Sequence, residues 1–255
     1  MSSIIYDKYF GKEYSYSLFK TQEKKSNNIY IYYYQNSISS FAYLFSSFYI
    51  YFNRKNYSLS CSVIEILLFL LSFVSFFWWA SQRLFIHKID ILLYSSFLLI
   101  PGLYNLSNNS YITDAIFVIL LCLFNFFNYL LILNNKYSII KKINGLSVLF
   151  SLYLLYEIRN IIFYDTCLFI ISFIYKLGDT YKFIKYTNIS GTAIFHLISA
   201  FVYGTLISNI NNYDKFPNSF SNVCNLSLCE VIFSTNLSIS SRCCGCSPIP
   251  TELLK

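Results

Sequence analysis

The chain has 255 residues, of which 56% are hydrophobic, 21% aromatic and 12% charged, whereas about a quarter of the residues in an ordinary soluble domain are charged. So few charges cannot cover the surface of a packed chain of this length, which argues against a soluble globule; collagen, a charged coiled coil and a charge-rich disordered chain are excluded. The net charge of +7 comes from scattered Lys and Arg without a basic stripe. We therefore expect anionic membrane lipids as partners, and no nucleic acid.

Two apolar segments of different character open the chain. Residues 26–53 carry no charge, yet Ser and Asn punctuate them and residues 30–34 form a tyrosine-rich tract. Because tyrosine rings favour the level of the lipid head groups, we expect an interfacial segment here. Residues 62–82 contain a single acid and end in Trp78 and Trp79, close to positive charges. That pattern predicts a helix that spans or deeply enters the bilayer.

The middle of the chain holds the strongest apolar run. Residues 91–113 are uncharged but contain Pro101, so we expect their helix to stop just before the proline and a turn to follow. Residues 115–135 carry no charge over 21 residues, which at about 1.5 Å per residue matches a hydrocarbon core about 30 Å thick. Asn125 and Asn128 lie three residues apart within this run. They share one helical face, which predicts contact with a partner helix.

Charges interrupt the apolar residues from residue 141 to residue 182. They leave uncharged stretches of 14 and 10 residues, which are short for spans, so we expect amphipathic helices lying on or partly in the membrane, with Gly178 as the stop. Residues 191–207 are again uncharged and rich in small residues. Small residues let helix backbones approach closely in lipid, so this segment is a second strong candidate for a span.

The sequence thus predicts an all-α integral membrane protein, with amphipathic interfacial helices and two or more transmembrane helices in a single domain over residues 1–210. The first 20 residues mix both signs of charge and lack a short apolar core, so we expect no secretory signal. Residues 211–255 form a polar tail rich in Ser, Asn and Cys that we expect to be poorly ordered.

The cysteines fall into two groups. Three sit singly in or beside apolar runs, where a buried, inert thiol is expected: Cys61, Cys122 and Cys167. The others lie in the tail, where no histidine pair or second CxxC supports zinc. Three of these lie beside Arg242 and resemble a reversible palmitoylation site: Cys243, Cys244 and Cys246.

Ionisable groups within a membrane are costly and therefore candidates for function. His196 lies inside an apolar stretch, with Thr192 one turn before it; Ser75 and Asp90 occur earlier in the chain, with Trp79 four residues after the serine. This order resembles the zinc-dependent, seven-helix lipid amidases of the alkaline ceramidase superfamily, which carry Ser-x-x-x-His, a later Asp and His-x-x-x-His. The likeness implies catalytic roles for Ser75, Asp90 and His196. Because Trp79 and Thr192 cannot ligate zinc, it also implies an enzyme that has lost its metal site.

A second likeness spans most of the chain. Residues 21–35, TQEKKSNNIYIYYYQ, pass from mixed charge to aromatic residues, and residues 81–92 place a serine, an arginine and a lysine near phenylalanine. Residues 141–159 form an amphipathic stretch ending in Tyr-Glu-Ile-Arg, and residues 160–178 run from Asn and Asp to Leu-Gly. In this order the segments resemble the peroxisomal biogenesis factor 11 family. His196 departs from that pattern, because a glycine is usual there.

The second resemblance, which we take as the leading hypothesis, implies a non-enzymatic factor without a cofactor or metal. Such proteins insert amphipathic helices into the cytosolic leaflet, self-associate, and elongate and divide peroxisomes. The inserting segments here would be residues 20–34 and residues 141–182, the latter attracted to anionic lipid by Lys141, Lys142 and Arg159. We expect a homo-oligomer in the peroxisomal membrane, with the endoplasmic reticulum as the alternative, in contact with fission machinery. The alternative functions are a degenerate ceramidase-like hydrolase and a transporter-like bundle.

Overall fold

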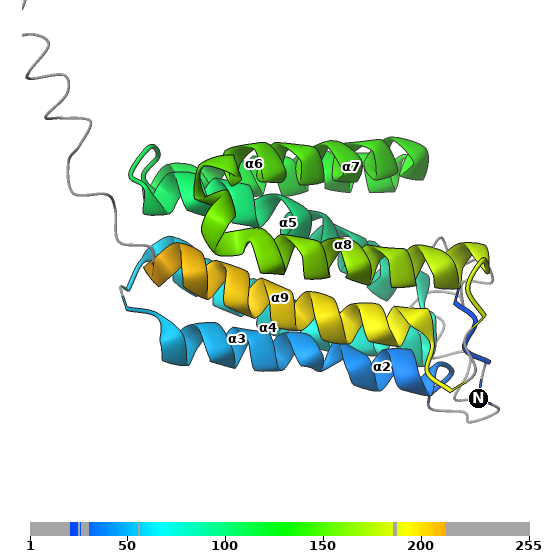
Figure 1. The fold of residues 1–255 in the computed structure, drawn as a ribbon. Helices are drawn as coiled ribbons and strands as arrows, with labels where there is room; N and C mark the ends of the chain where they lie inside the picture. Colours follow the sequence, from blue (N-terminus) through cyan, green and yellow to red (C-terminus); the bar gives the residue numbers. More distant parts are fainter. Residues whose placement is uncertain (1–20, 25, 27–30, 56, 186–187, 213–255) are drawn as a thin grey trace, which may run out of the picture. The chain divides into compact units, whose positions relative to one another are not determined.

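The computed structural model describes residues 21–24, 26, 31–55, 57–185 and 188–212. The chain divides into two units, residues 1–214 and 215–255, and the described residues all belong to the first. They contain helices and no β-strand, which confirms the all-helical class. The helices are α2 (Tyr34–Ser40), α3 (Ala42–Asn53), α4 (Leu59–Ser81), α5 (Leu84–Asn108), α6 (Asp114–Leu133), α7 (Tyr137–Leu154), the 3-10 turn η1 (Tyr156–Ile158), α8 (Arg159–Tyr181) and α9 (Gly191–Asn212) (Figure 1).

Helices α2 and α3 follow one another end to end and form one rod against α4 and α9 (Figure 1). Phe41 joins them through a tightened turn, in which its amide donates to the carbonyl of Ile38 at 3.1 Å. We predicted an interfacial segment here, but the polar residues of this rod bond to neighbouring helices. The Ser46 hydroxyl donates to the carbonyl of Ala200 at 2.5 Å, and that of Ser47 to the carbonyl of Glu65 at 2.8 Å. If α2 and α3 are counted as one rod, the described part of the chain contains seven helical rods.

Helix α5 continues through Pro101, contrary to the predicted stop. Proline removes a backbone donor and displaces the preceding turn, which leaves carbonyl oxygens without their usual helical partners. The carbonyl that loses its donor is that of Phe97, and the Ser151 hydroxyl on α7 donates to the next carbonyl along the helix, that of Leu98, at 2.9 Å. Gly102 lets the two helices approach this closely, because a Cβ atom there would lie 2.8 Å from the Cα of Ser151. The Pro-Gly pair therefore marks a helix crossing and not a helix end.

Five helices, α4, α5, α6, α8 and α9, are long and apolar enough to cross a membrane. Their length and composition indicate a membrane-embedded protein. Helix α6 is the most apolar of them, in keeping with its sequence. Asn125 on α6 accepts from the Ser96 hydroxyl of α5 at 2.8 Å, which confirms the predicted contact with a partner helix. Asn128 instead donates to a carbonyl of its own helix, that of Phe124.

Helix α8 differs most from its predicted form. It does not stop at Gly178 but runs to Tyr181, after which Lys182 adopts a left-handed conformation with φ of 60°. Asp165, Lys176 and Asp179 are buried and face the bundle, whereas Arg159, at the beginning of the helix, is exposed. A helix can carry charges this way when each has a partner: the carboxylate of Asp165 accepts from Thr205 at 2.6 Å and from Asn209 at 2.9 Å.

Two further expectations have mixed outcomes. Helix α7 keeps Lys141 and Lys142 exposed, as an amphipathic helix would.

Of the three single cysteines, Cys61 is buried, Cys167 is half-buried and Cys122 is exposed on α6, so the prediction of a buried thiol is wrong for Cys122. The tail with the predicted palmitoylation site lies outside the described residues.

Candidate functional site

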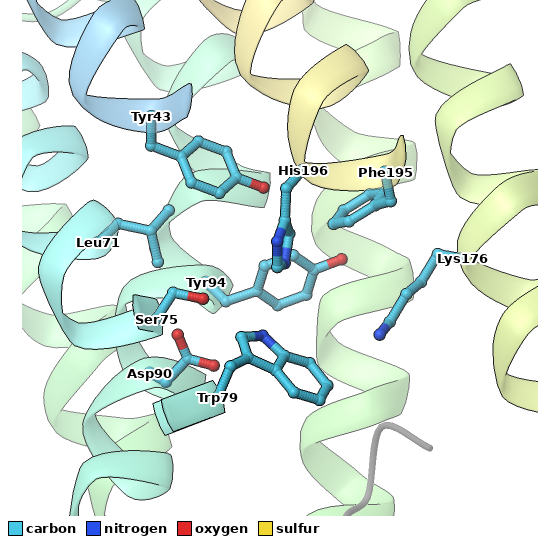
Figure 2. A pocket seen from close by; sticks show the side chains of 9 residues that line it. All are labelled: Tyr43, Leu71, Ser75, Trp79, Asp90, Tyr94, Lys176, Phe195 and His196. Atoms are coloured by element: carbon cyan, nitrogen blue, oxygen red, sulfur yellow. The ribbon is translucent and has the colours of Figure 1, made fainter. Parts of the chain in front are cut away.

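A small pocket of about 40 Å³ lies inside the bundle, near the end where α2 and α9 begin and α8 ends (Figures 1 and 2). Backbone bonds bring the end of α4 to the same place, because the amides of Tyr32 and Tyr33 donate to the carbonyls of Ala80 and Trp79 at 3.0 and 3.2 Å. Side chains from five helices line the pocket: Tyr43, Leu71, Ser75, Trp79, Asp90, Tyr94, Lys176, Phe195 and His196.

The structure brings together Ser75, Asp90 and His196, the three residues of the ceramidase-like pattern. They come from α4, α5 and α9 and all line this pocket (Figure 2). The Ser40 hydroxyl lies between two of them, 3.3 Å from the hydroxyl of Ser75 and 3.4 Å from Nδ1 of His196. Trp79 lines the same pocket. The pattern that the sequence spreads over more than a hundred residues is therefore compact in space.

The hairpin of α4 and α5 sets the positions of the serine and the aspartate. Helix α4 ends at Gln82, whose left-handed conformation, φ of 53°, turns the chain back into α5. Ser75 precedes this turn by seven residues and Asp90 follows it by eight. Antiparallel helices place such residues at the same level. In Figure 2 the Ser75 hydroxyl and the Asp90 carboxylate accordingly point toward one another.

Sequence reasoning missed Lys176, the cationic side chain of the pocket. Its Nζ atom donates to the hydroxyl of Thr192 at 2.8 Å and lies 5.1 Å from the centre of the Trp79 ring. The spacing of Lys176 and Asp179 on α8 was the available signal. Residues three apart share a helical face, and in an otherwise apolar helix such a pair belongs on the inner face.

Asp179 connects the pocket to the beginning of the described chain. Its carboxylate accepts the amide of Thr192 at 2.9 Å and also the hydroxyl of that threonine. From the other side it accepts the hydroxyl of Thr21 at 2.8 Å and the amide of Gln22 at 2.6 Å. We refer to residues 21–24 as the N-terminal strap. The strap is thereby bonded to α8 and α9.

Glu23 of the strap caps α2. Its carboxylate accepts the amides of Gln35 at 2.6 Å and Asn36 at 3.0 Å, in the first turn of that helix, where backbone N–H groups have no helical partner. Burial raises the pKa of Glu23, against the opposing effect of these two bonds. The strap falls within the first segment predicted to insert into lipid, residues 20–34. Lys24 is exposed, while Lys20, Lys25 and residues 27–30 lie outside the described part of the chain.

The pocket does not fit a zinc ion. Among the described residues no group of three His, Cys, Asp or Glu side chains could hold a metal. His196 is the single imidazole of the pocket lining, and its Nδ1 atom is 2.9 Å from the hydroxyl of Ser39. An indole and a threonine hydroxyl take the other two histidine positions, and neither is a zinc ligand. What the pocket does offer is a set of hydrogen-bonding groups beside aromatic walls.

The chain matches no protein-family model, no curated protein and no solved structure.

Proposed function

We propose that this protein is an integral membrane protein of the degenerate ceramidase-like type, which binds the polar group of an amphiphilic ligand and does not hydrolyse it with a metal. One observation carries the proposal: Ser75, Asp90 and His196 line one pocket although they belong to three different helices. A chance match of three scattered residues would not be expected to converge. The seven rods of the described chain agree with the seven-helix architecture implied by that resemblance.

The chemistry of the pocket favours a small uncharged polar group. Asp90 and Lys176 supply opposite charges, and Tyr43 and Ser75 supply hydroxyls, so an amide or hydroxyl could find both donors and acceptors. Leu71 and the aromatic residues make the remaining wall apolar, which suits an adjoining hydrocarbon chain. An amphiphile such as a ceramide-like amide has both parts.

Peroxisome elongation stays a prediction from the sequence, as do self-association and contact with fission machinery. It requires amphipathic helices, and in residues 141–182 only α7 has exposed lysines together with a buried face. Helix α8 exposes Arg159 at its beginning, but it buries Asp165, Lys176 and Asp179 further along, which suits a spanning helix better than an interfacial one. The location in a peroxisomal or endoplasmic reticulum membrane is likewise a prediction.

The test uses the full-length protein in lipid nanodiscs with a fluorescent short-chain ceramide analogue. We expect saturable binding, weakened about tenfold or more by Asp90→Asn, which removes a charged hydrogen-bond partner. Asp165→Asn is the matched control, because it changes another buried acid of a membrane helix that does not line this pocket. Release of the fatty acid is measured in parallel, with and without added zinc, and we expect none.

Two results would contradict the proposal. Fatty-acid release that His196→Ala abolishes would identify an active hydrolase. Equal binding by the wild type and Asp90→Asn would place any bound ligand elsewhere. If, in addition, the protein drew liposomes into tubules and Lys141→Glu/Lys142→Glu prevented it, the remodelling function would replace the one proposed here.

A further inference from the structure

We propose that Lys176 is a built-in cation that occupies the place of the metal in this pocket. The inference rests on the proposed function, because that resemblance is what defines the metal position. It goes beyond the loss of the two histidines, since it assigns a role to a residue that the ceramidase-like pattern does not contain. It also explains why a tryptophan and a threonine stand at the two histidine positions.

The position of the Lys176 amino group supports this role. The amino group of Lys176 contacts both positions at which the pattern has histidine: it donates to Thr192 at 2.8 Å and lies over the Trp79 ring at 5.1 Å. Ligands of one metal ion converge on a single point, so a group that contacts both of these side chains lies close to that point. Figure 2 shows Lys176 reaching from α8 into the pocket toward Trp79.

The chemistry of the side chains at the two histidine positions also suits an ammonium group. Tryptophan provides the strongest of the cation–π surfaces, and a threonine hydroxyl accepts a hydrogen bond from an ammonium group. Both side chains can therefore stabilise a cation that carries its own hydrogens. Neither can supply the lone pair that zinc takes from an imidazole. Trp79 and Thr192 are thus suited to an ammonium group and unsuited to a metal ion.

The charges around Lys176 agree with this role. Lys176 interacts electrostatically with two acids, Asp179 on its own helix and Asp90 on α5. A nearby cation stabilises two carboxylates inside a helical bundle. The structure supplies it from α8, so the pocket needs no bound ion for its charge balance. A divalent cation beside this ammonium group would be repelled.

The experiment restores the histidines in the full chain and asks whether Lys176 opposes the metal. The variants are Trp79→His/Thr192→His, the same pair with Lys176→Gln, and the same pair with Lys185→Gln as the control, since Lys185 is exposed. Bound zinc per chain is measured by mass spectrometry of the purified protein in detergent. Zinc affinity is measured by competition with a chromophoric chelator.

We expect the chain with Lys176→Gln to bind one zinc ion at least about tenfold more tightly than the chain with the two histidines alone, because a neighbouring positive charge is removed. The Lys185→Gln control should leave the affinity of the two-histidine chain unchanged. Equal affinity with and without Lys176 would overturn the inference and leave the proposed function standing. No zinc in any folded variant would overturn both, because the pocket would then not correspond to a metal site.

Loss of Lys176 leaves Asp90 and the buried Asp179 without their cation, and the variant could fail to fold. In that case Asp90→Asn is added to every chain, which restores the charge balance, and the same comparison is made. A second readout is thermal unfolding. Zinc should raise the melting temperature of the Lys176→Gln chain with two histidines more than that of its Lys176 parent, and an equal rise would contradict the inference.

Discussion

Single residues decide what the pocket can bind. Ser75, Asp90 and His196 give it a hydrogen-bonding lining, while Trp79 and Thr192 take the positions that would make it a metal centre. One indole in place of one imidazole is enough to remove a tetrahedral zinc site, because three protein ligands are the usual minimum.

Glu23 provides a prediction at the same scale. Its folded-state pKa is raised above the ordinary value of 4.5, so the folded chain binds more protons than the unfolded chain as the pH rises above that value. Its contribution to stability is therefore greatest below about pH 4.5 and is lost as the pH rises through the raised pKa. Melting temperatures between pH 4.5 and 7 should fall more steeply for the wild type than for Glu23→Gln, and parallel curves would contradict this.

The pocket residues also show what the sequence could and could not reveal. The spacing of Ser75, Asp90 and His196 was visible as a motif, but a motif does not say that its residues meet. The spacing of Lys176 and Asp179 indicates an inward-facing pair on α8, but the partner of Lys176 depends on α8 and α9 lying side by side, which no local pattern encodes. That partner, Thr192, is seen only in the folded structure.

At the scale of helices, the misread segments share a physical cause. Pro101 was expected to end its helix, but here the turn before the proline packs against α7, whose Ser151 donates to the Leu98 carbonyl. Ser46 and Ser47 of α3 resembled interruptions in an apolar run, yet they donate to backbone carbonyls of adjacent helices. Long, uniformly apolar segments such as α6 were predicted well, because their pattern needs no tertiary partner.

The crossing of α5 and α7 gives a prediction about stability. Gly102→Ala places a methyl group 2.8 Å from the Cα of Ser151, a contact with backbone that cannot rotate away, and should destabilise the protein by about 1–3 kcal/mol. Gly145→Ala on the exposed face of α7 is the control, because nothing lies within 4 Å of its Cβ position; there alanine should stabilise the helix by up to about 1 kcal/mol. Thermal unfolding in detergent measures both, and equal effects would argue against a close crossing.

For the whole molecule, the distribution of polar groups is inverted relative to a soluble protein. Acids, amides and hydroxyls such as Asp179, Asn36 and Ser40 are buried, whereas Phe45, Leu123 and Phe126 are more than half exposed. Such a surface is stable among acyl chains and would aggregate in water.

Cys122 can test this arrangement. It is exposed on α6, so its thiol should contact lipid in a native membrane. A water-soluble maleimide added to intact membrane vesicles should leave Cys122 unmodified, and should modify it after solubilisation in SDS, as followed by peptide mass spectrometry. A Lys141→Cys variant serves as the exposed reference on α7 and should react in permeabilised vesicles. Rapid modification of Cys122 before solubilisation would contradict its contact with lipid.

The strap has a consequence for how the protein is made. Thr21 bonds to Asp179, a residue 158 positions later in the chain, and the same carboxylate fixes the start of α9. Contacts so distant in sequence form late, because a long loop must close first. The ribosome must therefore deliver α8 and the start of α9 before the strap can find its place, so this end of the bundle is assembled after most of its helices have been made.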